Sequence, residues 1–379
     1  MAGLNPRAAD RMREVLQQQV DRRRIPGLVA MVAIGGKTEF SAALGQQDPV
    51  AGTPMQPDAI FRIYSMTKPI VSLAALMLVE QGRLQLVDPL AKYLPVFAGQ
   101  RVLQADGTLV PVTRGATVQD LLRHTAGFTY EFLGDSPVQM QYRQADIAAR
   151  ERSNADFCAV LASMPLAHQP GSCWEYSRAT DVLGALLEVV TGKTLGVLLQ
   201  DMVLGPLGMK DTGFSLSAQQ QARLAEPFGT DPDSGEAVVM MDARVVPAFE
   251  SGGGGLLSTA TDYARFLHLM RNGGSLDGVR LASRKTIAWM TADHLGAIPP
   301  KGDMLLPGYG FGLGVAVRTH TGLAPQAGSV GQYFWTGIGG TSFFVDPAED
   351  LFAMLLTQGP NQRFFFRNLW RQLVYGALD

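Results

Sequence analysis

Two different spacings of hydrophobic residues follow one another along the chain, and they predict strands at its two ends and helices between them. The apolar runs "GLVAMVAI" (27–34) and "TEFSAAL" (38–44) are separated by Gly-Gly-Lys, which predicts a β-hairpin. Residues 65–240 show mostly a helical spacing. Strand-like runs return near the end of the chain: "YGFGLGVAVR" (309–318), "GQYFWTGI" (331–338), "TSFFVDP" (341–347) and "LFAMLLTQ" (351–358).

Several helix starts can be located from capping residues. Asn5 followed by Pro6 is a favourable cap and first-turn pair, and it predicts a helix to about Arg24. Further starts are expected at Thr117, Ser153 and Thr180. Two later helices are expected over residues 259–272 and 283–292.

The last apolar stretch, residues 361–378, predicts an amphipathic helix. Its stripe consists of Phe366, Leu369, Trp370 and Leu373. We interpret it as a helix docked on a sheet, with a membrane-surface helix as the alternative. The order of elements predicts an α/β domain from residues 1–75 and 240–379, with residues 76–239 inserted as a mainly helical domain.

Composition narrows the classes of partner. The chain has 379 residues, 46% of them hydrophobic, and a formal net charge of −2 without a basic cluster, so we expect no nucleic-acid partner. No window approaches about 18 uninterrupted apolar residues, and the first 24 residues lack the apolar core of a signal peptide. We therefore expect no membrane span and a cytoplasmic location. Cys158 and Cys173 are expected to be buried thiols.

Candidate chemistry begins at "FRIYSMTKPIVSLAALMLVEQG" (61–82), where Ser65 and Lys68 are three positions apart at the start of an apolar helix. Residues i and i+3 share a helix face, so the two side chains can touch. A serine hydroxyl is a poor nucleophile unless a neighbouring group accepts its proton, and burial lowers the pKa of a lysine enough to make it such a group. By itself the motif is weak, since about one Ser-x-x-Lys is expected by chance in a chain of this length.

Two further segments strengthen this interpretation. Residues 170–193 place Tyr176 and Ser177 in an extended segment before a helix, which supplies a phenol. Residues 328–347 read as strand, glycine turn and strand, with Trp335 near the end of the first strand. The amide of Ile338 there can serve as an oxyanion donor, and Gly337 keeps the strand open for close approach of a substrate.

These three elements, in this order, resemble the SxxK, YxN and KTG elements of the penicillin-recognising serine hydrolases. Among these enzymes the chain most resembles the family VIII carboxylesterases, which are themselves similar to class C β-lactamases. The resemblance also involves "HTAGFTY", "PLGMKDTGF" and "SGGGGLLSTATDYARFL", and it covers roughly residues 20–360. It implies an α/β (α+β) fold of the β-lactamase/transpeptidase type, in which helices flank an antiparallel sheet. The active site would lie in the cleft between this domain and the helical one.

The resemblance also implies roles for individual residues. Ser65 would be acylated by an ester, Lys68 and Tyr176 would move its proton, and the amides of Ser65 and Ile338 would form the oxyanion hole. Which of Lys68 and Tyr176 is the base stays open. The chemistry requires no cofactor or metal, and the expected partner is a small-molecule ester. The natural substrate and the oligomeric state, including a homo-oligomer, stay open.

Two departures from the family pattern bear on the substrate. Trp335 stands where β-lactamases have a lysine that holds a substrate carboxylate, so we expect neutral, apolar esters of short to medium acyl length. Ser177 and Arg178 stand where the second element usually ends in asparagine. We expect Arg178 to be a solvated or ion-paired surface residue, with restored anion affinity as the alternative.

Some assignments have competitors. The tripeptide "HTG" (320–322) is a second candidate for the third element, but a loop composition follows it. "TGKT" (191–194) resembles the end of a phosphate loop, yet Gly192 is better explained as a helix stop. His124 is expected to make a structural turn contact, because the chain has no GxSxG motif for a triad. Candidate pocket residues, in addition to Trp335 and Gly337, are Phe128, Tyr130, Phe132 and Phe334.

Several functions share the same acyl-enzyme. An acyltransferase, an amidase or a weak β-lactamase would use the same residues and differ only in leaving group or acceptor. A non-catalytic sensor that is acylated by its ligand is an alternative from another class. The sequence favours an esterase, because Ser65, Lys68 and Tyr176 are all present and no further domain is evident.

Overall fold

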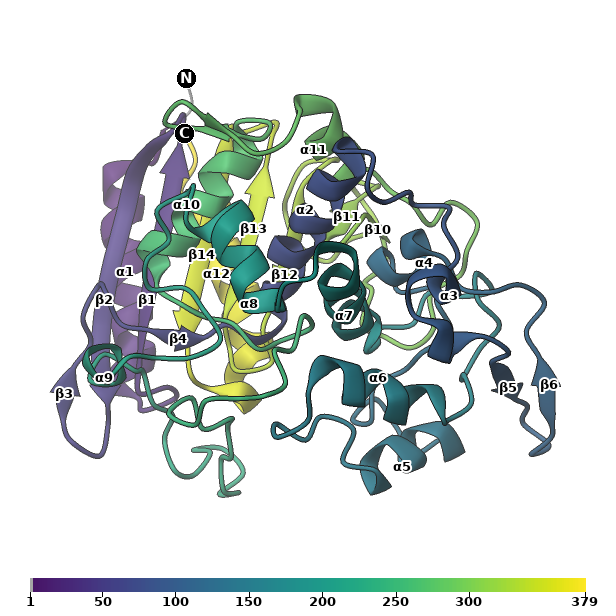
Figure 1. Cartoon of the computed structure of the whole chain (residues 1–379). Helices are drawn as coiled ribbons and strands as arrows, with labels where there is room; N and C mark the ends of the chain where they lie inside the picture. The colour runs from purple at the N-terminus through teal and green to yellow at the C-terminus, as the bar shows by residue number, and fades with distance from the viewer. Residues whose placement is uncertain (1–2) are drawn as a thin grey trace.

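The centre of the molecule is one antiparallel sheet of eight strands in the order β10-β11-β12-β13-β14-β1-β2-β3 (Figure 1). The computed structural model describes residues 3–379. Residues 1 and 2 of the predicted domain segment 1–75 therefore lie outside the described residues. The strands are β1 (Gly27–Ile34), β2 (Lys37–Asp48), β3 (Thr53–Pro54), β10 (Tyr309–Phe311), β11 (Ala316–Arg318), β12 (Tyr333–Thr336), β13 (Ser342–Asp346) and β14 (Leu351–Thr357). The two ends of the chain therefore build the sheet, as predicted.

The middle of the sheet joins the two ends directly. β1 pairs antiparallel with β14, from Leu28 opposite Thr357 to Ile34 opposite Leu351. Every residue of β14 is buried, because helices cover both faces of the sheet here. This double coverage explains why the strand reads as an unbroken apolar run rather than an alternating one.

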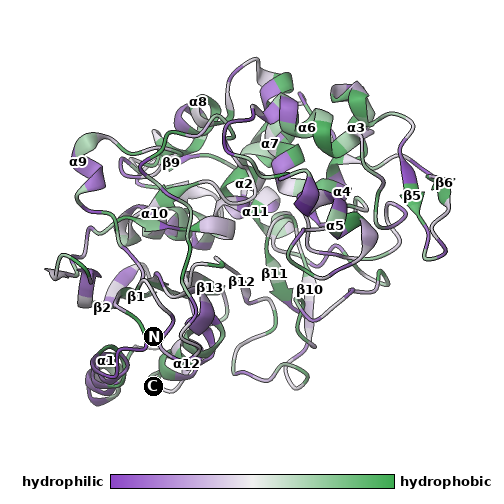
Figure 2. Ribbon diagram, turned by 90° about the horizontal axis from the view of Figure 1, so that it is seen from below, coloured by the Kyte–Doolittle hydropathy of each residue, from purple (hydrophilic) through white to green (hydrophobic). Residues whose placement is uncertain are grey.

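Alternate residues of the central strands pack into two separate cores. Leu351, Ala353 and Leu355 of β14 pack with α1 (Pro6–Asp21) and α12 (Arg363–Tyr375). Phe352, Met354 and Leu356 point the other way, into the larger core that contains α2 (Thr67–Glu80) and α10 (Ala260–Arg271). Figure 2 shows α1 and α12 together on one side of the strands and α2 and α10 on the other.

The amphipathic stripe near the end of the chain is docked on the sheet, and the membrane-surface alternative is wrong for its main residues. Phe366, Trp370 and Val374 of α12 are each at most 1% exposed and belong to the core shared with α1. Leu369 and Leu373 are half-buried at the margin of this stripe. Within residues 3–379 no single helix is long and apolar enough to cross a membrane. The bent pair Ala179–Thr191 and Leu195–Leu204 reaches the required length and hydropathy only when its two helices are taken together.

In sequence, the remaining helices lie between β3 and β10, that is, between the strands contributed by the two ends of the chain. They are α3 (Leu90–Tyr93), α4 (Val118–Leu122), α5 (Pro137–Gln144), α6 (Asn154–Ala162), α7 (Ala179–Thr191), α8 (Leu195–Leu199), α9 (Ala218–Gln221) and α11 (Arg284–Met290). Three two-stranded pairs accompany them: β4 (Phe61–Arg62) with β7 (Leu257–Ser258), β5 (Arg101–Leu103) with β6 (Leu109–Pro111), and β8 (Ser275–Leu276) with β9 (Val279–Arg280). In Figure 1, α3 to α6 and the β5-β6 pair lie away from the sheet, beyond α2 and α7.

Most helix starts are where the caps predict them. Asn5 accepts from the amides of residues 7 and 8, and Thr117 and Ser153 form capping boxes. The helix expected near Thr180 begins one residue earlier, at Ala179, and it has no side-chain cap, because the preceding Arg178 makes ion pairs instead. Gly192 ends α7 in the left-handed region at φ 70°, as expected of a helix stop.

Other elements differ from the sequence pattern. The run 309–318 forms two short strands, β10 and β11, paired as a hairpin rather than one strand. Gly314 in the connection has φ 95° and adjoins Ser72, so only glycine fits. Residues 222–256 contain no helix or strand although they partly fall in the expected helical region. The domain boundary at residue 75 falls inside α2, and the division into 1–75 with 240–379 and 76–239 stays a prediction.

Candidate active site

Ser65 lies in a single 3₁₀ turn, Tyr64–Met66, directly before α2. The regular helix thus begins two residues later than the expected start at Ser65. Tyr64 has φ 45°, an uncommon conformation for a large residue, and its hydroxyl accepts a hydrogen bond from the Met241 amide at 3.1 Å. Lys68 follows in the first turn of α2, and because residues three apart share a helix face, its side chain lies beside that of Ser65.

Lys68 is fully buried, and its contacts are made with neutral groups. Its Nζ lies 3.2 Å from Ser65 Oγ, 2.9 Å from the hydroxyl of Tyr130 and 2.5 Å from the backbone oxygen of Gly253. Burial lowers the pKa of Lys68 to about 7, while the charge of Asp181 opposes the change. The amine is therefore available in its neutral form near neutral pH.

Tyr176 reaches Ser65 from the extended segment before α7. Its hydroxyl donates to Ser65 Oγ at 2.6 Å and accepts from Nε1 of Trp335 at 3.3 Å. Burial raises the pKa of Tyr176, which keeps the phenol neutral. His124 holds this segment in place, because its Nδ1 accepts from the Ser177 amide at 3.2 Å, and it makes the structural contact expected from the sequence.

The end of β12 closes the site on its other side. β11 pairs with β12 only through Tyr333 and Phe334, which leaves Trp335 and the following residues without a strand neighbour on that edge within the described chain. A Cβ on Gly337 would lie 2.5 Å from the backbone oxygen of Ile63, so glycine is required for the turn to approach the residues before Ser65. Within residues 3–379 the Ile338 amide donates to no backbone oxygen.

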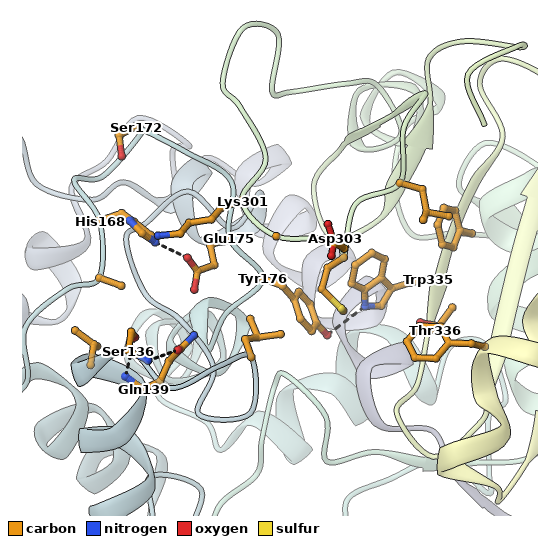
Figure 3. A pocket seen from close by; sticks show the side chains of 18 of the residues that line it. Ser136, Gln139, His168, Ser172, Glu175, Tyr176, Lys301, Asp303, Trp335 and Thr336 are labelled. Atoms are coloured by element: carbon orange, nitrogen blue, oxygen red, sulfur yellow. Dashed lines mark hydrogen bonds and ion pairs between the residues drawn. The ribbon is translucent and has the colours of Figure 1, made fainter. Parts of the chain in front are cut away.

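A cavity of about 1240 Å³ reaches Tyr176 and Trp335 (Figure 3). One wall is apolar and includes Phe334, whereas another carries the ion pair of His168 with Glu175. Figure 3 shows Lys301 beside this pair. The cavity is large enough for an ester with a medium acyl chain, and its polar wall lies next to Tyr176 in sequence and in space.

The expected pocket aromatics have different positions. Phe334 lines the cavity, but Phe128 does not, because it is 1% exposed and packs edge-on against Phe97 in the core. Tyr130 contacts Lys68 rather than the cavity, and the half-exposed Phe132 stacks on it. The surface-exposed His320 lies in the loop after β11, so the competing "HTG" element is remote from the end of β12.

Arg178 is ion-paired, as one form of the expectation had it, but it is not a surface residue. Arg178 is 8% exposed and pairs with Glu131 and Asp181. Two carboxylates saturate its charge, so restored affinity for an anionic substrate at this residue finds no support. Cys158 is buried as expected, whereas Cys173 is only half-buried, and both are free thiols.

Sequence reasoning missed three contacts of the site. It assigned Tyr130 to the pocket, although its hydroxyl binds Nζ of Lys68. It did not identify Gly253, whose oxygen also binds Nζ, or Asp181, whose Oδ1 accepts from the Gly253 amide at 2.9 Å. The only local signals were the glycine run that contains Gly253 and an acidic residue in the first turn of α7.

Comparison with known proteins gives a family model and several relatives, among them esterases, that agree with one another. Residues 12–377 match the family model described as Beta-lactamase. Esterase EstB of Burkholderia gladioli is 37% identical over 373 residues, which cover 92% of this chain and 90% of EstB. Lovastatin esterase of Penicillium rubens is 32% identical, covering 70% of this chain and 69% of that protein. The solved structure of EstCE1, a hydrolase with promiscuous acyltransferase activity, superposes with a TM-score of 0.80 at 29% identity, covering 97% of this chain and 98% of EstCE1.

Proposed function

Because this chain belongs to the beta-lactamase family, and within it resembles the family VIII esterases, we propose that it is a serine carboxylesterase acting through an acyl-enzyme on Ser65. One observation carries the assignment of the nucleophile. Ser65 Oγ lies within hydrogen-bonding distance of both a buried amine and a buried phenol, Lys68 Nζ at 3.2 Å and Tyr176 hydroxyl at 2.6 Å. The esterase relatives support the ester as substrate class.

The directions in which the pKa values of Lys68 and Tyr176 are shifted suggest which proton transfer each group performs. With its pKa lowered to about 7, Lys68 is the group that accepts the Ser65 proton. Tyr176, with a raised pKa, stays protonated and relays a proton to the departing alkoxide. Tyr130 orients the amine through its 2.9 Å contact.

The reaction then proceeds in two displacement steps. Ser65 Oγ attacks the ester carbonyl as its proton passes to Lys68, and the oxyanion is bound by the amides of Ser65 and Ile338. The C–O bond to the alcohol breaks, and the alkoxide leaves as an alcohol after taking up a proton. Water attacks the acyl-enzyme with the same proton carriers and releases the carboxylic acid.

Trp335 and the cavity favour neutral esters. In sequence, Trp335 stands where the resemblance implies a lysine that holds a carboxylate, and its Nε1 donates to the Tyr176 hydroxyl. Arg178 does not replace that cation, because it is ion-paired. Turnover of carboxylated substrates such as β-lactams is therefore expected to be weak beside turnover of short and medium acyl esters.

Acyl transfer is a second candidate, since the similar EstCE1 is described as having promiscuous acyltransferase activity. The same acyl-enzyme would then be attacked by an alcohol in place of water. Product analysis with an added primary alcohol distinguishes the two. Ester formation at the expense of acid would identify a transferase, and an unchanged acid yield a hydrolase.

The direct test is the intact mass of the protein after brief exposure to p-nitrophenyl butyrate and, separately, to a fluorophosphonate. We expect one adduct, mapped to Ser65, and steady release of p-nitrophenol. Ser65→Ala should lower turnover by about 10⁴-fold or more. An adduct on another residue, or a tenth of the activity left in Ser65→Ala, would contradict the assignment of Ser65 as the nucleophile.

A further inference from the structure

A side chain of α12 touches the peptide group that carries the second oxyanion donor. Nη2 of Arg367 donates to the backbone oxygen of Gly337 at 2.7 Å. That oxygen and the Ile338 N–H belong to one planar peptide group, because a peptide joins the carbonyl of one residue to the amide of the next. In a trans peptide the two bonds point in opposite directions, so Arg367 and the reacting carbonyl lie on opposite ends of the same dipole.

Other hydrogen bonds fix the orientation of this peptide. The Gly340 amide also donates to the Gly337 oxygen, at 3.1 Å, and closes a four-residue turn. The Gly337 amide in turn donates to the oxygen of Thr341 at 2.8 Å. Both lone pairs of the Gly337 oxygen are therefore used, and the Ile338 N–H is directed out of the turn.

Arg367 has no evident structural reason to be charged. Its side chain is half-buried and lines the same cavity as Tyr176, and its Nε is buried without a hydrogen-bond partner within residues 3–379. No carboxylate of residues 3–379 pairs with it, whereas Arg178 has two. Burial lowers the pKa of Arg367, yet a guanidinium stays protonated at neutral pH. A cation that is partly withdrawn from water without a counter-ion is destabilising, so a role in the site would explain it.

We propose that Arg367 is a positioning residue that strengthens the Ile338 amide as an oxyanion donor. Donation to the carbonyl oxygen draws electron density from the peptide nitrogen, and hydrogen bonds in a chain reinforce one another. The positive charge behind the peptide adds to the stabilisation of an oxyanion in front of it. The inference rests on the proposed function, because it assumes that Ile338 N–H binds the oxyanion.

The kinetic test uses a graded series at one position. Deleting a whole oxyanion donor lowers kcat by about 10²–10³-fold, so weakening one should lower it by about tenfold. We expect this loss in Arg367→Met, for both acylation and deacylation, a smaller loss in Arg367→Gln, and recovery in Arg367→Lys. The matched control is Arg363→Met, one turn earlier on α12, whose guanidinium donates to Pro360 instead. Its rates should stay at the wild-type level.

A vibrational measurement separates this role from a merely structural one. The acyl-enzyme formed from a ¹³C=O-labelled cinnamoyl p-nitrophenyl ester reports the hydrogen bonding of its carbonyl as an infrared band. In Arg367→Met and Arg367→Gln the band should move to higher frequency, and in Arg363→Met and Arg367→Lys it should stay close to wild type. Because two neutral variants are used, failure of one to fold leaves the test intact.

One result would overturn the inference while leaving the proposed function standing, namely an acyl-enzyme on Ser65 whose carbonyl band is the same in the wild type and in the neutral variants. If the pH profile of kcat/KM were shifted at the same time, Arg367 would act through Tyr176 instead. Absence of any Ser65 adduct in the wild type would instead overturn the proposed function itself.

Discussion

Two fully buried charged side chains, Lys68 and Asp120, are held in opposite ways. Asp120 accepts from Arg114, Arg123, Thr125 and the backbone of the helix cap, and these donors hold its pKa below the ordinary value although burial opposes them. The amine of Lys68 is hydrogen-bonded to two hydroxyls and a carbonyl, and burial lowers its pKa toward neutrality. Both side chains are 0% exposed, so burial alone does not explain the difference.

The contrast shows what surrounding groups do to a buried charge. A charge that is saturated with opposite charges and donors keeps one protonation state and serves the fold. A buried amine among neutral partners can gain or lose its proton at little free-energy difference, which general-base catalysis requires. We therefore expect changes at Asp120 to alter stability and changes at Lys68 to alter activity.

The largest expected effect is that of Lys68→Met. Removing the base should lower kcat/KM for p-nitrophenyl butyrate by about 10³–10⁴-fold. The melting temperature should rise at the same time, because an apolar side chain replaces a poorly compensated amine. A stopped assay and a thermal melt on the same sample measure both, and a variant that loses stability together with activity would break the comparison.

Asp120→Asn should produce the opposite pattern. The amide cannot accept from two guanidinium groups as a carboxylate does, so the free energy of unfolding should fall by about 2–3 kcal/mol. Urea unfolding followed by tryptophan fluorescence gives this value. The kcat of the folded fraction should stay close to wild type, and a large fall in kcat at unchanged stability would contradict the separation of roles.

The pH dependence distinguishes the two groups again. Since the base is the neutral amine, kcat/KM should fall about tenfold per pH unit below the Lys68 pKa of about 7. The folded pKa lies below the unfolded one, about 10.4, so the unfolded chain binds a proton in this window and stability rises with pH from about 7 to about 10. This slope should be absent in Lys68→Met. Asp120, with a lowered folded pKa, instead contributes stability that is lost as pH falls below about 4.

The smallest effect is expected from Asp181→Asn. The carboxylate of Asp181 raises the pKa of Lys68, so its removal should move the acidic limb of the kcat/KM profile to lower pH, by less than about one unit. The amide oxygen can still accept from the Gly253 amide and Ser251 hydroxyl, which keeps the geometry. A limb that moves to higher pH would show that Asp181 affects Lys68 by another route.

The parts of the fold that local patterns control were predictable. The hairpin of β1 and β2, the cap at Asn5 and the boxes at Thr117 and Ser153 depend on residues within a few positions of one another. The burial of Arg178 before α7 was not predictable, because it depends on Glu131, 47 positions away. The need for glycine at position 314, between β10 and β11, likewise could not be predicted, because Ser72 adjoins Gly314 only in the folded chain.

The residues of the candidate site likewise fall into those that could be predicted from local sequence and those that could not. Ser65, Lys68 and Tyr176 could be identified because each lies in a short segment of recognisable composition and order. Tyr130 and Phe128, two positions apart in "GFTY", could not be separated, although one contacts Lys68 and the other fills the core. Side-chain direction in a loop depends on tertiary contacts that periodicity does not encode.

The pairing of β1 with β14 has a consequence for biosynthesis. The ribosome must add more than 300 residues after β1 before its partner strand exists, since β1 ends at Ile34 and β14 begins at Leu351. Until then the nascent hairpin of β1 and β2 presents an unpaired apolar edge, which is a site for aggregation. Completion of the sheet is therefore a late event in synthesis, and the nascent chain should depend on chaperones that cover this edge during elongation.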